Sequence, residues 1–163
     1  IIDANKKAQT LQAAITNLNF ALESMSREMR VGNNYRCDSY SGPFSGGTFD
    51  AKECDGESVI VFVSSKTAPN NNGTCNLAIA YRFNSESGVT KLQKAQQPDC
   101  TTPIDVNSYS DMLDPNVFIS SYKLVVHDGE YPLAFIKISG YAGSREKEKT
   151  YFDVQTAVSA RVP

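Results

Sequence analysis

The sequence predicts an α+β fold in which one long N-terminal helix packs on an antiparallel β-sheet, with long disulfide-stapled loops. Apolar residues near the start follow a helical spacing, whereas the rest of the chain alternates strand-like runs with turn-rich segments. No second amphipathic helix is available, so the apolar helix stripe has to lie on one face of the sheet. We predict one domain over residues 1–163, with the helix over 1–32 and the loops and sheet over 33–163.

The helix prediction depends on an apolar stripe with alternating steps of three and four residues. The stripe comprises Ile1, Ala4, Ala8, Leu11, Ile15, Leu18, Leu22, Met25 and Met29. Gly32 is a candidate for the residue that ends the helix. A helix over residues 3–31 is about 43 Å long at 1.5 Å per residue, whereas a domain of this size has a radius of gyration of about 15 Å. The first helical turns, where the stripe thins to Ala4 and Ala8, should therefore project. Such an end needs either a partner or a continuation of the helix.

The remainder of the chain predicts about six strands and two long loops. The strand-like segments are 58–65, 76–83, 88–95, 117–126, 133–142 and 150–160. The second and third flank the sequence NSES and predict a hairpin, and Asp128-Gly129 predicts the turn between the fourth and fifth. Residues 33–57 and 96–116 are rich in turn-forming side chains and predict the loops.

Composition excludes several classes of partner. The chain is 40% hydrophobic and 21% charged, which is ordinary for a globular domain, and its net charge is −2. No basic cluster is present, so nucleic acids and anionic membrane surfaces are not expected partners. The sequence as given has no apolar run of about 18 residues that would span a membrane.

The four cysteines predict two disulfides. Cys37, Cys54, Cys75 and Cys100 form no C-x-x-C pair, and His127 is the only histidine, so a zinc site is not expected. Widely spaced cysteines in a loop-rich chain indicate an oxidising compartment. Three pairings are open. We favour Cys37–Cys54, which closes one loop, and Cys75–Cys100, which flanks the predicted hairpin.

The sequence contains no assembled catalytic motif. His127 precedes Asp128, but adjacent strand residues point to opposite faces and no nucleophile motif accompanies them. We therefore do not expect an enzyme. Asp105, Asp111 and Asp114 are weak candidates for a calcium site. Their spacing does not match an EF-hand loop, so turn and capping roles are favoured, and no cofactor is predicted.

Two segments of the sequence resemble those of a known protein family. The segment LNFALESMSREMRVGNNYRC, residues 18–37, resembles the helix exit of minor pseudopilins and minor pilins from type II secretion and related type IV filament systems. The segment YFDVQTAVSARVP, residues 151–163, resembles their final strand. That strand often carries a Gln-Thr-x-Val-Ser-x-Arg motif. The corresponding residues here are Gln155, Thr156, Val158, Ser159 and Arg161. Between residues 40 and 115 the chain matches the family only in the order of its elements.

The resemblance implies a structural role in a filament. By that resemblance, the intact protein carries a leader, a prepilin-peptidase site and an apolar helix half anchored in the inner membrane, with the domain in the periplasm or on the cell surface. The chain would then be a minor subunit of a type II secretion pseudopilus or a type IV pilus, acting in assembly initiation or at the tip. Its partners would be other pilin-like subunits and an exported cargo protein, and the helix face at Ala4, Ala8 and Leu11 would meet neighbouring subunits.

Two other interpretations remain open. One is a secreted or filament-displayed adhesive module that binds its ligand through the aromatic loops near residues 35–49 and 98–115. The other is a coiled-coil homodimer, since the stripe spans about four heptads. We discount the second because a helix engaged in a coiled coil would leave the sheet uncovered.

Overall fold

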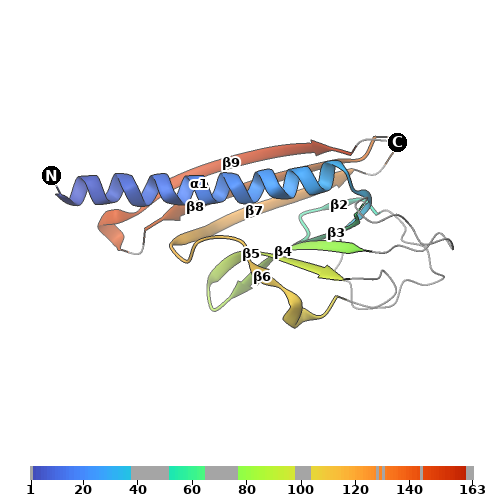
Figure 1. Cartoon of the computed structure of the whole chain (residues 1–163), viewed down its shortest axis with the longest axis horizontal. Helices are drawn as coiled ribbons and strands as arrows, with labels where there is room; N and C mark the ends of the chain where they lie inside the picture. Colours follow the sequence, from blue (N-terminus) through green and yellow to red (C-terminus); the bar gives the residue numbers. More distant parts are fainter. Residues whose placement is uncertain are drawn as a thin grey trace.

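The protein is built of two layers, a long helix and one antiparallel sheet. The computed structural model describes residues 2–37, 52–64, 77–97, 104–127, 129, 131–143 and 145–160. Helix α1, Ile2–Arg30, lies along one face of the sheet, and its N-terminal end reaches past the strands (Figure 1). The described part of the chain contains no helix with the length and hydropathy needed to cross a membrane.

The nine strands form a single sheet. Their order is β1-β3-β4-β5-β7-β8-β9, with β2 beside β7 and β6 beside β5. The strands are β1 Asn33–Arg36, β2 Cys54–Asp55, β3 Val59–Val63, β4 Ala78–Glu86, β5 Val89–Gln97, β6 Ser110–Asp111, β7 Val117–His127, β8 Leu133–Ala142 and β9 Thr150–Ser159. Short 3-10 helices cover Val106–Ser108 and Glu146–Glu148. β5 meets β7 through one residue pair, Thr90 with Ile119, so two strand groups are joined by a narrow link.

The predicted α+β class is wrong. About half of the described residues lie in strands, and all of these strands belong to one nine-stranded sheet, so the protein is richer in sheet than that class implies. The sequence predicted about six strands, and the three it missed have only two to four residues each. Such short polar segments have no period to detect. These three strands are β1, β2 and β6, and they lie in the two regions that the sequence predicted as loops.

The long elements follow their predictions closely. The helix was predicted over residues 3–31 and spans Ile2–Arg30. The hairpin of β4 and β5 is tighter than predicted, because the strands continue through the sequence NSE to a two-residue turn at Ser87 and Gly88, both with positive φ. Gly32 follows the helix but is not left-handed. A Cβ atom there would come within 2.4 Å of the Phe62 ring, so glycine is needed for this close approach.

The main core lies between α1 and the sheet. Its largest fully buried side chains come from both layers, namely Tyr35, Tyr81, Phe62, Leu18, Met25, Met29, Ile60, Ile79, Leu92, Leu124, Ile136 and Ile138. A second, smaller cluster lies on the opposite face of β3, β4 and β5 and comprises Val59, Val61, Ala78, Ala80, Ala95 and Ile104. The helix is therefore fixed to the sheet by burial of its C-terminal half.

Candidate interaction surface of the N-terminal helix

The two halves of α1 have opposite environments. Every residue from Ala4 to Gln9 is exposed, whereas Leu18, Met25 and Met29 are completely buried. Leu11 lies between these halves and is half-buried. We call residues 4–11 of α1 the free end. The structure thus places Ala4 and Ala8 in solvent, where the predicted filament contact requires them, and Leu11 at the border.

One aromatic side chain of α1, outside the free end, is exposed. The Phe20 side chain is 73% exposed, although it belongs to the half of α1 that packs on the sheet. It lies at one end of a shallow depression in the helix surface, lined by Gln9, Gln12, Ala13, Thr16, Asn17 and Phe20. A large exposed aromatic side chain on an otherwise polar surface is a feature of contact sites.

A partly buried polar cluster joins the helix to the sheet. The Tyr81 hydroxyl donates to Glu28 Oε2 at 2.5 Å, and Lys94 Nζ donates to Glu28 Oε1 at 2.7 Å. The side chains of Lys94 and Glu28 are only 20% and 11% exposed. Burial, together with the hydrogen bond to Glu28, strongly raises the pKa of Tyr81. We call Glu28, Tyr81 and Lys94 the helix clamp, because it ties one residue of α1 to both β4 and β5.

The end of the helix is held by two further contacts. The Tyr35 hydroxyl donates to the Met29 carbonyl in the last turn of α1, which also accepts from the Gly32 amide at 2.9 Å. Burial raises the pKa of Tyr35 to about 12. The disulfide Cys37–Cys54 follows directly and confirms the pairing that the sequence favoured. Because β2 pairs with β7, this bridge links the segment after α1 to the centre of the sheet.

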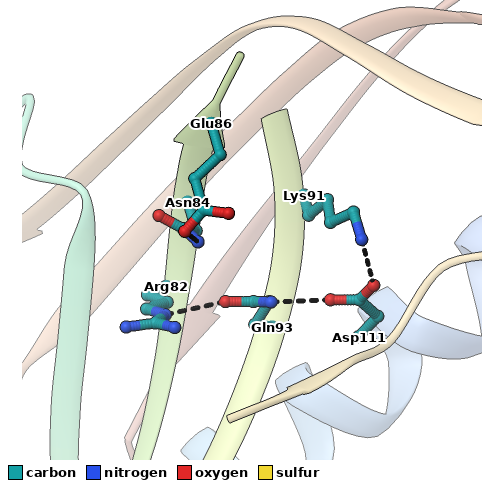
Figure 2. Close-up of polar contacts among 6 residues, drawn as sticks. All are labelled: Arg82, Asn84, Glu86, Lys91, Gln93 and Asp111. Carbon is teal, nitrogen blue, oxygen red and sulfur yellow. Dashed lines mark hydrogen bonds and ion pairs between the residues drawn. The ribbon is translucent and has the colours of Figure 1, made fainter. Parts of the chain in front are cut away.

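A chain of polar side chains runs across β4, β5 and β6 on the face away from the helix (Figure 2). Arg82 Nε donates to Gln93 Oε1 at 2.8 Å, and Gln93 Nε2 donates to Asp111 Oδ1 at 2.6 Å. Lys91 Nζ lies 2.6 Å from Asp111 Oδ2, and the bonds from Lys91 and Gln93 lower the pKa of this carboxyl. The Arg82 guanidinium also lies 3.8 Å from the centre of the Tyr109 ring. The network holds β6 and the 3-10 helix against the sheet.

The three aspartates proposed for calcium have separate partners. Asp105 caps the 3-10 helix by accepting from the Asn107 amide at 2.9 Å. Asp114 accepts from the Asn116 amide at 2.8 Å. Asp111 belongs to the network of Figure 2. Within the described ranges, no group of three or more His, Cys, Asp or Glu side chains is placed to hold a metal ion.

Several predicted features fall outside the described residues. Cys75 and Cys100 are among them, so their pairing stays a prediction. Asp128, residues 38–49 of the first aromatic loop and residues 98–103 of the second also lie outside the described residues. His127 is exposed at the end of β7, opposite Leu133 of β8.

Sequence reasoning missed the helix clamp and Phe20. Glu28 lies between Met25 and Met29, near the buried side of the helix. A charged residue at such a position indicates a buried partner. The identity of that partner depends on which strands lie beneath the helix, which no local pattern gives. Phe20 was visible as a large apolar residue off the apolar stripe.

Comparison with known proteins gives no relative: no family model, no curated protein and no solved structure matches the chain.

Proposed function

We propose that this protein is a structural subunit of an extracytoplasmic filament, a minor pseudopilin or minor pilin of a type II secretion pseudopilus or a type IV pilus. The observation that carries the proposal is the free end of α1, which stands clear of the sheet while the other half is buried. A helix that leaves its own domain in this way needs a partner for that end. The resemblance of segments 18–37 and 151–163 to minor pseudopilins and minor pilins supports the same role.

The anchored half of the helix suits this role. The clamp residue Glu28, the Tyr35 hydroxyl and the Cys37–Cys54 disulfide hold the C-terminal part of α1 and the segment that follows it. A force applied to the free end is therefore passed to the sheet rather than absorbed by bending of a loop. In this proposal other subunits contact Ala4, Ala8 and Leu11, and the domain meets cargo.

The disulfide supports an extracytoplasmic location. Disulfides persist in oxidising compartments and are rare in the cytosol. We propose that the domain lies in the periplasm or at the cell surface and that an N-terminal segment anchors the intact protein in the inner membrane. The native gene tests this directly: an encoded leader and an apolar stretch of about 20 residues joined to Ile1, with neighbouring pilin-like genes and an assembly ATPase, is the expected finding.

A matched pair of variants tests the contact surface. Ala4 and Asn5 are adjacent and exposed, but helix geometry places them about 100° apart around the axis. We expect Ala4→Arg to abolish filament assembly or filament-dependent export in the native host, and Asn5→Arg to retain most of it. Both should unfold at the temperature of the parent protein, because neither side chain is buried. Equal activity of the two variants would contradict the proposed contact face.

A further inference from the structure

The outer strand β9 presents an unpaired edge along its whole length. It pairs with β8 in an unbroken register of ten residues, from Thr150 opposite Ala142 to Ser159 opposite Leu133. No other described strand pairs with it. In Figure 1, β9 runs alongside α1 at the border of the molecule. Half of its backbone groups are therefore directed away from the sheet.

The register identifies those groups. The Ala160 amide donates to the Pro132 carbonyl at 3.0 Å, and these residues stand directly opposite each other in the register of β8 and β9. Hydrogen-bonded and non-hydrogen-bonded pairs alternate along an antiparallel ladder. The even-numbered residues of β9 therefore bond to β8. The outward amides and carbonyls belong to Tyr151, Asp153, Gln155, Ala157 and Ser159.

The chain protects its other sheet edge but not this one. β1 has four residues, its register with β3 shifts between Asn33 and Arg36, and Asn34 has a positive φ of 54°. Short length and irregularity are common ways of preventing edge-to-edge association. β9 has ten residues, no bulge, no proline and no lysine, and Asp153 is its only charge.

From these features we propose that β9 is a self-association site, at which a second copy of this chain adds its own β9 antiparallel and forms a symmetric dimer. The five outward residues are centred on Gln155. A two-fold axis at Gln155 pairs every outward residue with an outward residue of the other copy, namely Tyr151 with Ser159, Asp153 with Ala157 and Gln155 with itself. Each such pair exchanges two backbone hydrogen bonds, so no outward group is left over.

The side chains fit this register. The single charge of the strand, Asp153, meets an alanine, whereas an axis two residues earlier would set it against its own copy. The two Gln155 amides meet at the axis and can hydrogen-bond to each other. On the helix side, Phe152 comes opposite Val158, and Val154 comes opposite Thr156. A symmetric interface of this kind closes at two copies.

Helix α1 packs against β9 and β8 on this side of the sheet. Asn17 and Glu28 of α1 bond to Asp114 and Lys94, which places that flank of the helix toward β5 and β6. At about 100° per residue, the opposite flank, which lies toward β9, is centred on Ala8, Asn19 and Ser26. A second copy that pairs with β9 would therefore face this flank of α1. The self-association site, β9, shares no residue with the proposed filament contact at the free end, and it does not depend on that function.

Charge pairing at the axis tests the proposal. We expect the 163-residue chain to sediment at twice its mass of 17.8 kDa. Gln155→Lys and Gln155→Glu should each halve the sedimenting mass, because like charges then lie directly opposite each other. An equimolar mixture of the two variants should regain the dimer mass, which a misfolded variant would not do. A parent chain that sediments as a monomer, or variants that remain dimeric alone, would overturn the proposal.

A cross-linking pair tests the register. Residues in a hydrogen-bonded antiparallel pair have Cα atoms about 5.5 Å apart, which a disulfide can bridge. Gln155→Cys should therefore form a covalent dimer under mild oxidation. Ala157→Cys is the matched control, since it is equally exposed on the same strand but pairs with Asp153 of the other copy. Equal cross-linking of both variants, or none at residue 155, would refute the register centred there.

Discussion

Removal of one hydroxyl from the helix clamp should weaken the attachment of α1 to the sheet. In Tyr81→Phe, Glu28 loses the hydrogen bond of 2.5 Å that it accepts from the Tyr81 hydroxyl but keeps Lys94 at 2.7 Å. A hydrogen bond to a charged group contributes about 1.5–3 kcal/mol, and the Tyr81 side chain is 1% exposed, so water cannot replace it. We expect a loss of about 2 kcal/mol in the free energy of unfolding.

Urea denaturation followed by circular dichroism measures this loss. Tyr122→Phe is the control, because Tyr122 also packs against the main core, where it is half-buried and stacks on Phe83. Its hydroxyl makes no hydrogen bond that the described residues show. That control should change the free energy of unfolding by less than about 0.5 kcal/mol. If Tyr81→Phe costs no more than the control, Glu28 is adequately held by Lys94 and the clamp is not a cooperative unit.

Two further predictions concern packing and pH. Gly140→Ala should cost at least about 2 kcal/mol, measured by thermal unfolding, because its Cβ atom would lie 2.1 Å from the Phe118 carbonyl oxygen; Ser139→Ala, one residue away, is the control. Stability should also fall in alkali. Burial raises the pKa of Tyr35 to about 12 in the folded state, whereas an unfolded tyrosine titrates near 10. This contribution is complete below pH 10 and is lost as the pH rises to 12, by about 2.7 kcal/mol in total. Urea midpoints between pH 8 and 11 should therefore decrease, and Tyr35→Phe should make the decrease smaller without abolishing it, because burial also raises the pKa of Tyr81.

The long elements were predictable because each has its own period. The stripe from Leu18 to Met29 has helical steps, and β8 alternates between buried and exposed residues along most of its length. The fold class was not predictable in the same way. β2 has two residues, and it is a strand only because Cys54 and Asp55 lie beside Val126 and Val125 of β7. That pairing is a long-range event with no local trace in the sequence.

The candidate surface was also predictable from the sequence only in part. The exposure of Ala4 and Ala8 follows from helix length and a thinning stripe, so the sequence alone predicted it. The clamp required knowledge of which strands pass beneath Glu28, and Tyr81 and Lys94 come from two strands more than 50 residues away along the chain. Sequence separation of this size hides a contact even when each partner is an unusual residue for its position.

Strand β9 shows most clearly how a local pattern and a non-local arrangement combine. Its alternation fixes which side chains face the helix, and the sequence predicts this from the apolar residues Phe152, Val154 and Val158. Its position at the border of the described sheet depends on the order of all the other strands. Because of this position, no described strand bonds to the outward backbone groups of the odd-numbered residues. Even-numbered positions of β9 therefore serve folding, because they bond to β8 and face the core. Odd-numbered positions face away from the core, where Asp153 pairs with Lys137 and Tyr151 contacts Tyr141. Their backbone groups point outward from β8, which is the side on which a second copy would bind.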